Sequence, residues 1–159
     1  MTGVQTCALP ILSDAESFHS LFEFLPIGAY RSSPDGALLR ANPALVRMNG
    51  YASEAALLAA GHDLARDWYV QPQRRAAFLA QLERRGQVTA FVSEVRRLAG
   101  GERLWVRETA HQVMDAQGRC RYIEGTIEDI SEQQRSRSDF EQISDQLPGL
   151  VFRLLASPP

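Results

Sequence analysis

Five short stretches of the chain are candidates for β-strands. Two of them, GAYRS (28–32) and ALLRA (37–41), are joined by SPDG, a turn in which proline sets φ and glycine relieves strain. The other three, residues 87–98, 103–114 and 121–128, follow one another through the hairpin-like sequences AGGE and DAQG. The last stretch alternates apolar and polar residues, the period of a half-buried strand. The chain therefore predicts a two-strand hairpin and a three-strand meander.

Helical patterns fill the remaining segments. An amphipathic helix opens at a capping box, Ser13 with Glu16, and stops at Pro26. NPALVRMNG predicts a short helix with Asn42 as its N-cap and Gly50 just past its end. SEAALLAAG repeats this arrangement, and PQRRAAFLAQLERRG predicts a longer helix. The order of elements favours an α+β domain: a five-stranded antiparallel sheet, short helices on one face and an N-terminal amphipathic helix.

The last strand candidate runs into a helical segment without a turn residue between them. In YIEGTIEDISEQQRSRSDF (122–140), the alternation ends at Asp129-Ile130, and a polar, helix-favouring stretch follows at once. Ser131 and Gln134 have the spacing of a second capping box. Because a capped helix start transmits a displacement that a flexible loop would absorb, we expect this junction to act as a lever. The alternative is that Ser131 is only the N-cap that any such helix needs.

Two terminal segments stand apart from this domain. MTGVQTCALPI (1–11) matches a translated sequencing-library adapter, and it lacks the basic region and long apolar region of a signal peptide. FHSLFEFLPIGAYR (18–31) aligns without a gap with FEQISDQLPGLVFR (140–153), at an offset of 122 residues. We interpret residues 1–11 as foreign to the gene. We interpret the stretch that begins at Phe140 as the opening of another copy of the domain.

Composition excludes several classes of function. The 159 residues carry a net charge of −2 and no basic stripe, which argues against nucleic-acid binding, and no apolar run reaches the ~20 residues that span a bilayer. Cys7 and Cys120 form neither a disulfide framework nor a metal motif, which favours a reducing, cytoplasmic setting; the parent protein can still be tethered elsewhere. We find no phosphate loop, metal motif or Ser/His/Asp grouping, and alternation places Glu94, Glu108 and Glu124 toward solvent. The chain is not expected to be an enzyme.

The ordered segments together resemble a PAS domain with its PAC segment. The resemblance is carried by LPIGAYRSSPDGALLRANPALVRMNGY, VQPQRRAAFLAQLERRGQV, SEVRRLAGGERLWVRETAHQVMDAQGR and YIEGTIEDISEQQ, over about residues 20–131. It implies a sensory module of a multidomain bacterial signalling protein, a histidine kinase or a cyclic-di-GMP enzyme, with a homodimer and a downstream PAS copy as partners. The alternative is a dimerisation or scaffold module without a cofactor.

The resemblance also divides the chain and suggests its sites. We expect a leader at 1–11, an N-terminal helix at 12–25, the PAS/PAC domain at 26–130, a helical linker at 131–142 and a truncated second PAS domain at 143–159. The expected signal-transfer junction comprises Gly125, Asp129, Ile130, Ser131 and Gln134. The expected lining of a pocket for a small molecule comprises Tyr30, Asn42, Trp68, Tyr69, Trp105 and Ile123.

Cofactor-binding versions of the domain fit the sequence poorly. A flavin photosensor of the light-oxygen-voltage type needs a reactive cysteine in an Asn-Cys-Arg context on a pocket helix, whereas Cys120 lies beside the DAQG hairpin. Haem-binding members commonly ligate iron through a histidine on the long helix, and PQRRAAFLAQLERR has none. His62, which follows a helix end, is the remaining candidate for a haem ligand. We therefore expect no cofactor and no metal site.

Overall fold

The computed structural model describes residues 14–146. The first eleven residues, and nearly all of the segment assigned to a second domain copy, lie outside the described residues. The elements are α1 (Asp14–Phe24), β1 (Gly28–Ser32), β2 (Leu38–Ala41), α2 (Pro43–Met48), α3 (Glu54–Ala59), the π-helical turn η1 (Leu64–Trp68), α4 (Pro72–Arg85), β3 (Gln87–Arg96), β4 (Arg103–Met114), β5 (Cys120–Asp129) and α5 (Ser131–Gln146).

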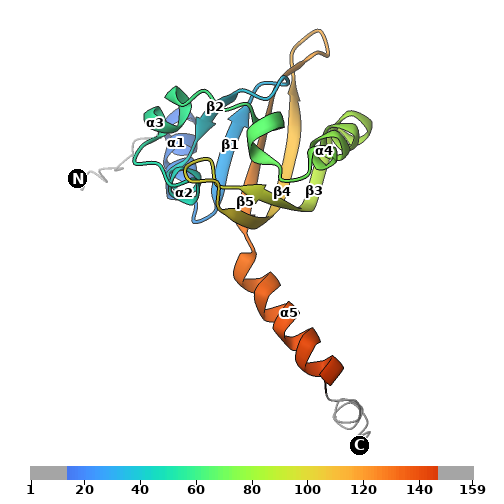
Figure 1. Ribbon diagram of the computed structural model, residues 1–159. Helices are drawn as coiled ribbons and strands as arrows, with labels where there is room; N and C mark the ends of the chain where they lie inside the picture. Colours follow the sequence, from blue (N-terminus) through green and yellow to red (C-terminus); the bar gives the residue numbers. More distant parts are fainter. Residues whose placement is uncertain (1–13, 147–159) are drawn as a thin grey trace, which may run out of the picture.

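The five strands form one antiparallel sheet in the order β2-β1-β5-β4-β3 (Figure 1). β5, the last strand in the chain, is the central strand and pairs with β1 on one side and β4 on the other. The sequence prediction of an α+β fold with a five-stranded antiparallel sheet is confirmed. The central position of β5 means that the strand leading into α5 is held along both edges.

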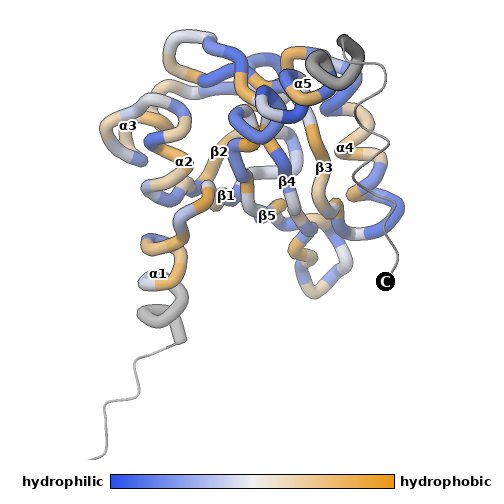
Figure 2. Tube along the Cα trace, turned by 90° about the horizontal axis from the view of Figure 1, so that it is seen from below, coloured by the Kyte–Doolittle hydropathy of each residue, from blue (hydrophilic) through white to orange (hydrophobic). Residues whose placement is uncertain are grey.

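The two faces of the sheet differ in character. One face, the inner face, carries the core, where Val106 of β4 packs with Phe78 and Leu82 of α4, and all three are fully buried. The opposite face, the outer face, carries mostly polar side chains such as Thr109 and Glu124. α1 projects away from the sheet (Figure 2), and α5 leaves it as an extended rod (Figure 1). Among the described residues, no helix is both long and apolar enough to span a membrane.

Asn42 fixes the entry to the helical layer. Its side-chain oxygen accepts from the backbone N–H of Leu45 at 3.0 Å, which caps α2, and from that of Ala29 in β1 at 2.8 Å. Its side-chain nitrogen donates to the carbonyl oxygens of Ile27 at 2.9 Å and Phe22 at 3.2 Å. A fully buried amide with all of these partners ties α1, β1 and α2 together. Asn42 is therefore a structural residue.

Candidate functional site

A carboxyl group lies in the core of the domain. Glu108 on β4 is only 3% exposed, because it follows Leu104 and Val106 on the inner face. Tyr30 donates its hydroxyl to Oε1 of Glu108 at 2.6 Å, and Tyr69 donates its hydroxyl to Oε2 at 2.9 Å. The sequence-based placement of Glu108 toward solvent is therefore wrong. Buried and exposed residues alternate along β4, as expected for a strand, but Glu108 occupies one of the buried positions.

A buried guanidinium lies near the same carboxyl group. Arg75, in the first turn of α4, is 7% exposed and lies 5.7 Å from the centre of the Phe78 ring. Its Nε atom has no hydrogen-bond partner among the described residues. Burial raises the pKa of Glu108, and the two tyrosine hydroxyls and the charge of Arg75 oppose that rise. Burial and the neighbouring Glu108 hold the pKa values of Tyr30 and Tyr69 well above their usual range.

These polar groups border a cavity of about 20 Å³ between the sheet and the helices. Its lining comprises Tyr30, Leu38, Leu45, Asn49, Leu64, Trp68, Tyr69, Arg75, Leu98, Glu108 and Ile127. Of the residues that the sequence suggested, Tyr30, Trp68 and Tyr69 lie in this lining. Ile123 is buried in the core beside it, and Trp105 is 41% exposed on the outer face. Arg75 and Glu108 were not expected there.

The segment that closes one side of the cavity is held by side chains. His62, which directly precedes Asp63 and η1, has its Nε2 atom 2.6 Å from the hydroxyl of Tyr51, and its Nδ1 atom lies 3.6 Å from a carboxylate oxygen of Asp67. The hydrogen bond from Arg66, together with that from the Asp63 backbone, lowers the pKa of Asp67 to about 2. His62 therefore belongs to a hydrogen-bonded set on the η1 segment, next to two residues of the lining.

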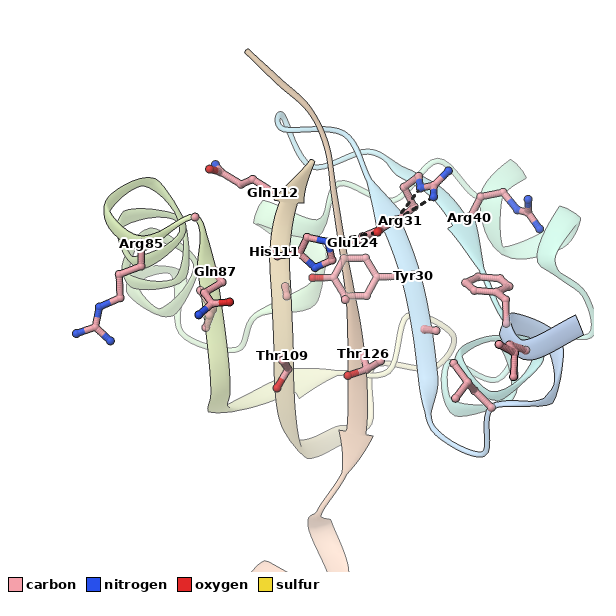
Figure 3. Close-up of a pocket in the computed structure, with 18 of the residues that line it drawn as sticks. Tyr30, Arg31, Arg40, Arg85, Gln87, Thr109, His111, Gln112, Glu124 and Thr126 are labelled. Carbon is pink, nitrogen blue, oxygen red and sulfur yellow. Dashed lines mark hydrogen bonds and ion pairs between the residues drawn. The ribbon is translucent and has the colours of Figure 1, made fainter. Parts of the chain in front are cut away.

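A much larger groove, of about 900 Å³, lies over the outer face (Figure 3). Leu21 and Phe22 of α1, with Leu25 just after the helix, line one side of it. Glu124 occupies its floor, where it pairs with Arg31 at 2.9 Å and with Nε2 of His111 at 3.3 Å. The groove thus combines an apolar helix face with a floor whose charges are paired.

The junction between β5 and α5 is bonded directly to β4. The backbone of Trp105 makes two contacts there: its carbonyl accepts from the N–H of Ile130 at 2.8 Å, and its N–H donates to Oγ of Ser131 at 2.9 Å. The N–H of Ser131 donates to the carboxylate of Asp129 at 2.9 Å. Only Ile130, which is 4% exposed, therefore separates the end of β5 at Asp129 from the start of α5 at Ser131.

The predicted capping box at this junction has a different geometry. The N–H of Gln134 donates to the carbonyl of Ile130 at 2.9 Å, a regular helical bond, and not to the Ser131 side chain. The Ser131 hydroxyl oxygen accepts from the backbone N–H of Trp105 instead. A further bridge comes from Arg107, whose Nε lies 3.2 Å from the carboxylate of Glu128 and whose terminal nitrogen donates to the Gln133 side chain at 3.2 Å. The first turn of α5 is thus joined to β4 as well as to β5.

Among the described residues, no group of three His, Cys, Asp or Glu side chains is arranged to hold a metal ion. Cys120, at the start of β5, lies outside the cavity lining, and burial raises the pKa of its thiol. A thiol that is harder to ionise is a weaker nucleophile.

Comparison with known proteins identifies the fold. No curated protein matches the chain. Among solved structures, an RNA-binding light-oxygen-voltage receptor is 21% identical with a TM-score of 0.67; the match covers 92% of this chain but only 41% of the receptor. A PAS domain from Colwellia psychrerythraea is 15% identical with a TM-score of 0.62, over 74% of this chain and 98% of that one. A domain of a sensory box sensor histidine kinase/response regulator from Geobacter sulfurreducens is 24% identical with a TM-score of 0.56, over 72% and 93%.

Residues 22–135 match the family described as the PAS fold, and this range contains the whole sheet, the interior cavity and the start of α5. PAS domains are generally sensory, non-catalytic modules. The chain belongs to the PAS family.

Proposed function

We propose that this PAS domain is a sensory module of a multidomain bacterial signal-transduction protein and relays the state of a ligand or partner through the Asp129-Ile130-Ser131 junction to α5. A histidine kinase or a cyclic-di-GMP enzyme is the expected parent. The similar solved structures include a PAS domain from a two-component sensor histidine kinase and a domain of a sensory box sensor histidine kinase/response regulator, which supports the first of these. The observation that carries the proposal is the direct bonding of the start of α5 to β4.

The proposed route from the interior to α5 is short. Glu108 in the core and Trp105 at the junction lie three residues apart on β4. Both backbone groups of Trp105 bond to the residues that begin α5. A change in the hydrogen bonds of Glu108 that shifts β4 along its length would therefore shift the first turn of α5. Because hydrogen-bonded strands and helices are stiff, the displacement would pass to the end of the helix.

Inserting two or three glycines after Ser131 in the full-length parent is expected to abolish regulation while leaving basal output activity in place. The insertion would separate the bonded junction from the rest of α5, and flexible glycines would absorb the displacement. The measurement is output activity with and without stimulus. The same insertion after Gln117, in the exposed hairpin between β4 and β5, is the control and should leave regulation intact. Unchanged regulation after the Ser131 insertion would contradict the proposed relay.

A second function, dimerisation without sensing, is favoured by the outer face. Leu21 and Phe24 on α1 are 69% and 84% exposed, and Leu21 also lines the groove of about 900 Å³. A second copy of the chain that packs its own α1 against this groove would bury these side chains. We therefore propose that the domain forms a homodimer through α1 and the outer face, whether or not it also senses a ligand.

Replacing Leu21 and Phe24 together with glutamate is expected to convert a dimer into a monomer. The charges would have to be buried in the proposed interface, which is costly. Light scattering after size-exclusion chromatography, at high micromolar protein, measures the change. Met114→Glu, at a half-exposed residue on the end of β4, is the matched control. A wild-type protein that is monomeric at this concentration would overturn the proposed dimer.

A further inference from the structure

One polar atom in the lining of the interior cavity has no hydrogen-bond partner among the described residues. Each oxygen of Glu108 already accepts a tyrosine hydroxyl. The amide of Asn49 is also occupied, because its nitrogen donates to the carbonyl of Leu45 and its oxygen accepts from the N–H of Leu98. The Nε–H of Arg75, in contrast, is buried and has no acceptor among the described residues. Since a buried donor without a partner is costly, this position calls for an acceptor.

The remaining lining restricts what that acceptor can be attached to. The lining also includes aliphatic side chains, Leu38, Leu64 and Ile127 among them, which together are called the aliphatic wall. A cation is disfavoured because Arg75 already supplies a positive charge. A carboxylate is the acceptor that a guanidinium binds best, since both can form charge-assisted hydrogen bonds.

We propose that the cavity binds a small monocarboxylate of two to four carbons, with its carboxylate on Arg75 and its alkyl group against the aliphatic wall. This inference rests on the proposed sensory function and names its ligand class. The residues that would hold the ligand head are Arg75, Tyr69 and Glu108, and those that would contact its tail are Leu38, Leu64 and Ile127.

Binding of a carboxylate next to Glu108 has a consequence for protons. Two carboxylates in one buried site cannot both be ionised at low cost, so one proton is shared between them. The titratable groups that face Glu108 are Tyr30 from β1, Tyr69 from the segment after η1 and Arg75 from α4. Burial already favours the protonated form of Glu108. The ligand is therefore expected to enter with uptake of up to one proton.

The size of the cavity requires the η1 segment to move. About 20 Å³ holds roughly one water molecule, so a ligand of several heavy atoms needs Leu64 and Trp68 to shift outward. η1 is a single π-helical turn, a geometry found often at functional sites. Its start is held to the β1–β2 turn by the antiparallel bridge between Ala37 and Asp63, which includes the bond from the N–H of Leu64 to the carbonyl of Gly36 at 3.2 Å. A ligand of two to four carbons would require a smaller outward shift of these side chains than a longer chain.

Titration of the wild-type domain with sodium propionate tests the proposal. In nitrogen-15 NMR spectra, the indole signal of Trp68, which lines the cavity, should shift, whereas that of Trp105, on the outer face, should not. Calorimetry in two buffers of different ionisation enthalpy should reveal proton uptake, and affinity should rise by up to about tenfold for each unit that the pH falls toward about 6. Propionamide, propylamine and hexanoate should bind at least about tenfold more weakly.

Substitutions at Arg75 separate this site from other modes of binding. Arg75→Gln should weaken propionate binding at least about tenfold, while Arg84→Gln, at an exposed position on the same helix, should not change it. If Arg75→Gln does not fold, Arg75→Lys and the wild-type analogue series decide the matter. A Trp105 shift in place of a Trp68 shift, equal binding of propylamine, or no propionate binding at tens of millimolar would overturn the ligand assignment.

The outcome is distinguishable from that of the relay experiment. If propionate binds as expected and the Ser131 insertion leaves regulation unchanged, the relay fails and the ligand assignment stands. If propionate does not bind but the insertion uncouples regulation, the ligand assignment fails and the relay stands.

Discussion

Replacing Glu108 with leucine is expected to lower the free energy of unfolding by about 3–5 kcal/mol. The hydroxyls of Tyr30 and Tyr69 would each lose their acceptor in a buried site, at about 1–3 kcal/mol per hydroxyl. The buried guanidinium of Arg75 would lose its neighbouring carboxyl group as well. Urea denaturation, followed by circular dichroism, measures the change. A loss below about 1 kcal/mol would contradict the central role assigned to this carboxyl group.

Two further variants show whether hydrogen bonding is the cause. The combined variant Glu108→Leu, Tyr30→Phe and Tyr69→Phe leaves no hydroxyl without an acceptor, so part of the lost stability should return. Glu102→Gln removes a carboxylate that is 56% exposed and pairs with Arg97 at the surface. Because exposed ion pairs contribute little, this control should cost less than about 1 kcal/mol.

The effect of Glu108 on stability also depends on pH. Its pKa is raised in the folded protein, so between its unfolded pKa, about 4.3, and its higher folded pKa the native state binds more protons than the unfolded state. The stability that this group contributes is therefore fully present below the unfolded pKa and is lost as the pH rises through the folded pKa. Consequently, the cost of Glu108→Leu should be larger at about pH 5 than at about pH 8.

The sequence carried a signal for this buried cluster that pattern reading passed over. Arg75 lies in the apolar stripe of α4 with Phe78 and Leu82, and Glu108 is in phase with Val106 and Ala110 on β4. A positive charge on the apolar face of the helix and a negative charge on the apolar face of the strand indicate that these two faces meet through a polar contact. The sequence interpretation took alternation to place Glu108 toward solvent, as is usual for a glutamate, and gave no weight to its phase with Val106 and Ala110.

Other features could not have been predicted because they depend on long-range contacts. The sheet, α4 and the direct passage from β5 into α5 follow from periodicity, turn residues and helix caps near each other in sequence. The partner of the Ser131 hydroxyl is the backbone of Trp105, which is 26 residues away, and local capping rules cannot identify it. Both faces of β4 carry apolar and polar residues, so the sequence does not show which face points into the core. The packing of the sheet decides this, and it places Trp105 on the outer face.

Replacing Gly125 with alanine is expected to lower the free energy of unfolding by about 3 kcal/mol. Gly125 lies at the centre of β5, opposite Tyr30 of β1 and Ala110 of β4. A Cβ atom there would lie 2.5 Å from the carbonyl oxygen of Thr109 and 2.8 Å from the Cβ of Ala110. Both atoms belong to β4 itself and cannot rotate away, so overpacking must move one strand relative to the other. Chemical denaturation measures the loss.

The same substitution at Gly118 isolates the contribution of steric contact. Gly118 lies in the hairpin turn with φ +75°, and a Cβ atom there would meet nothing within 4 Å. Gly118→Ala should therefore cost only the backbone strain, about 1 kcal/mol. Gly125→Ala should in addition push β5 away from β4, which would lengthen the bond between the Ile130 N–H and the Trp105 carbonyl. Faster hydrogen exchange at Ile130 in Gly125→Ala, but not in Gly118→Ala, would show that the position of β5 controls the start of α5, whereas equal exchange in both variants would mean that the junction is insensitive to the strand.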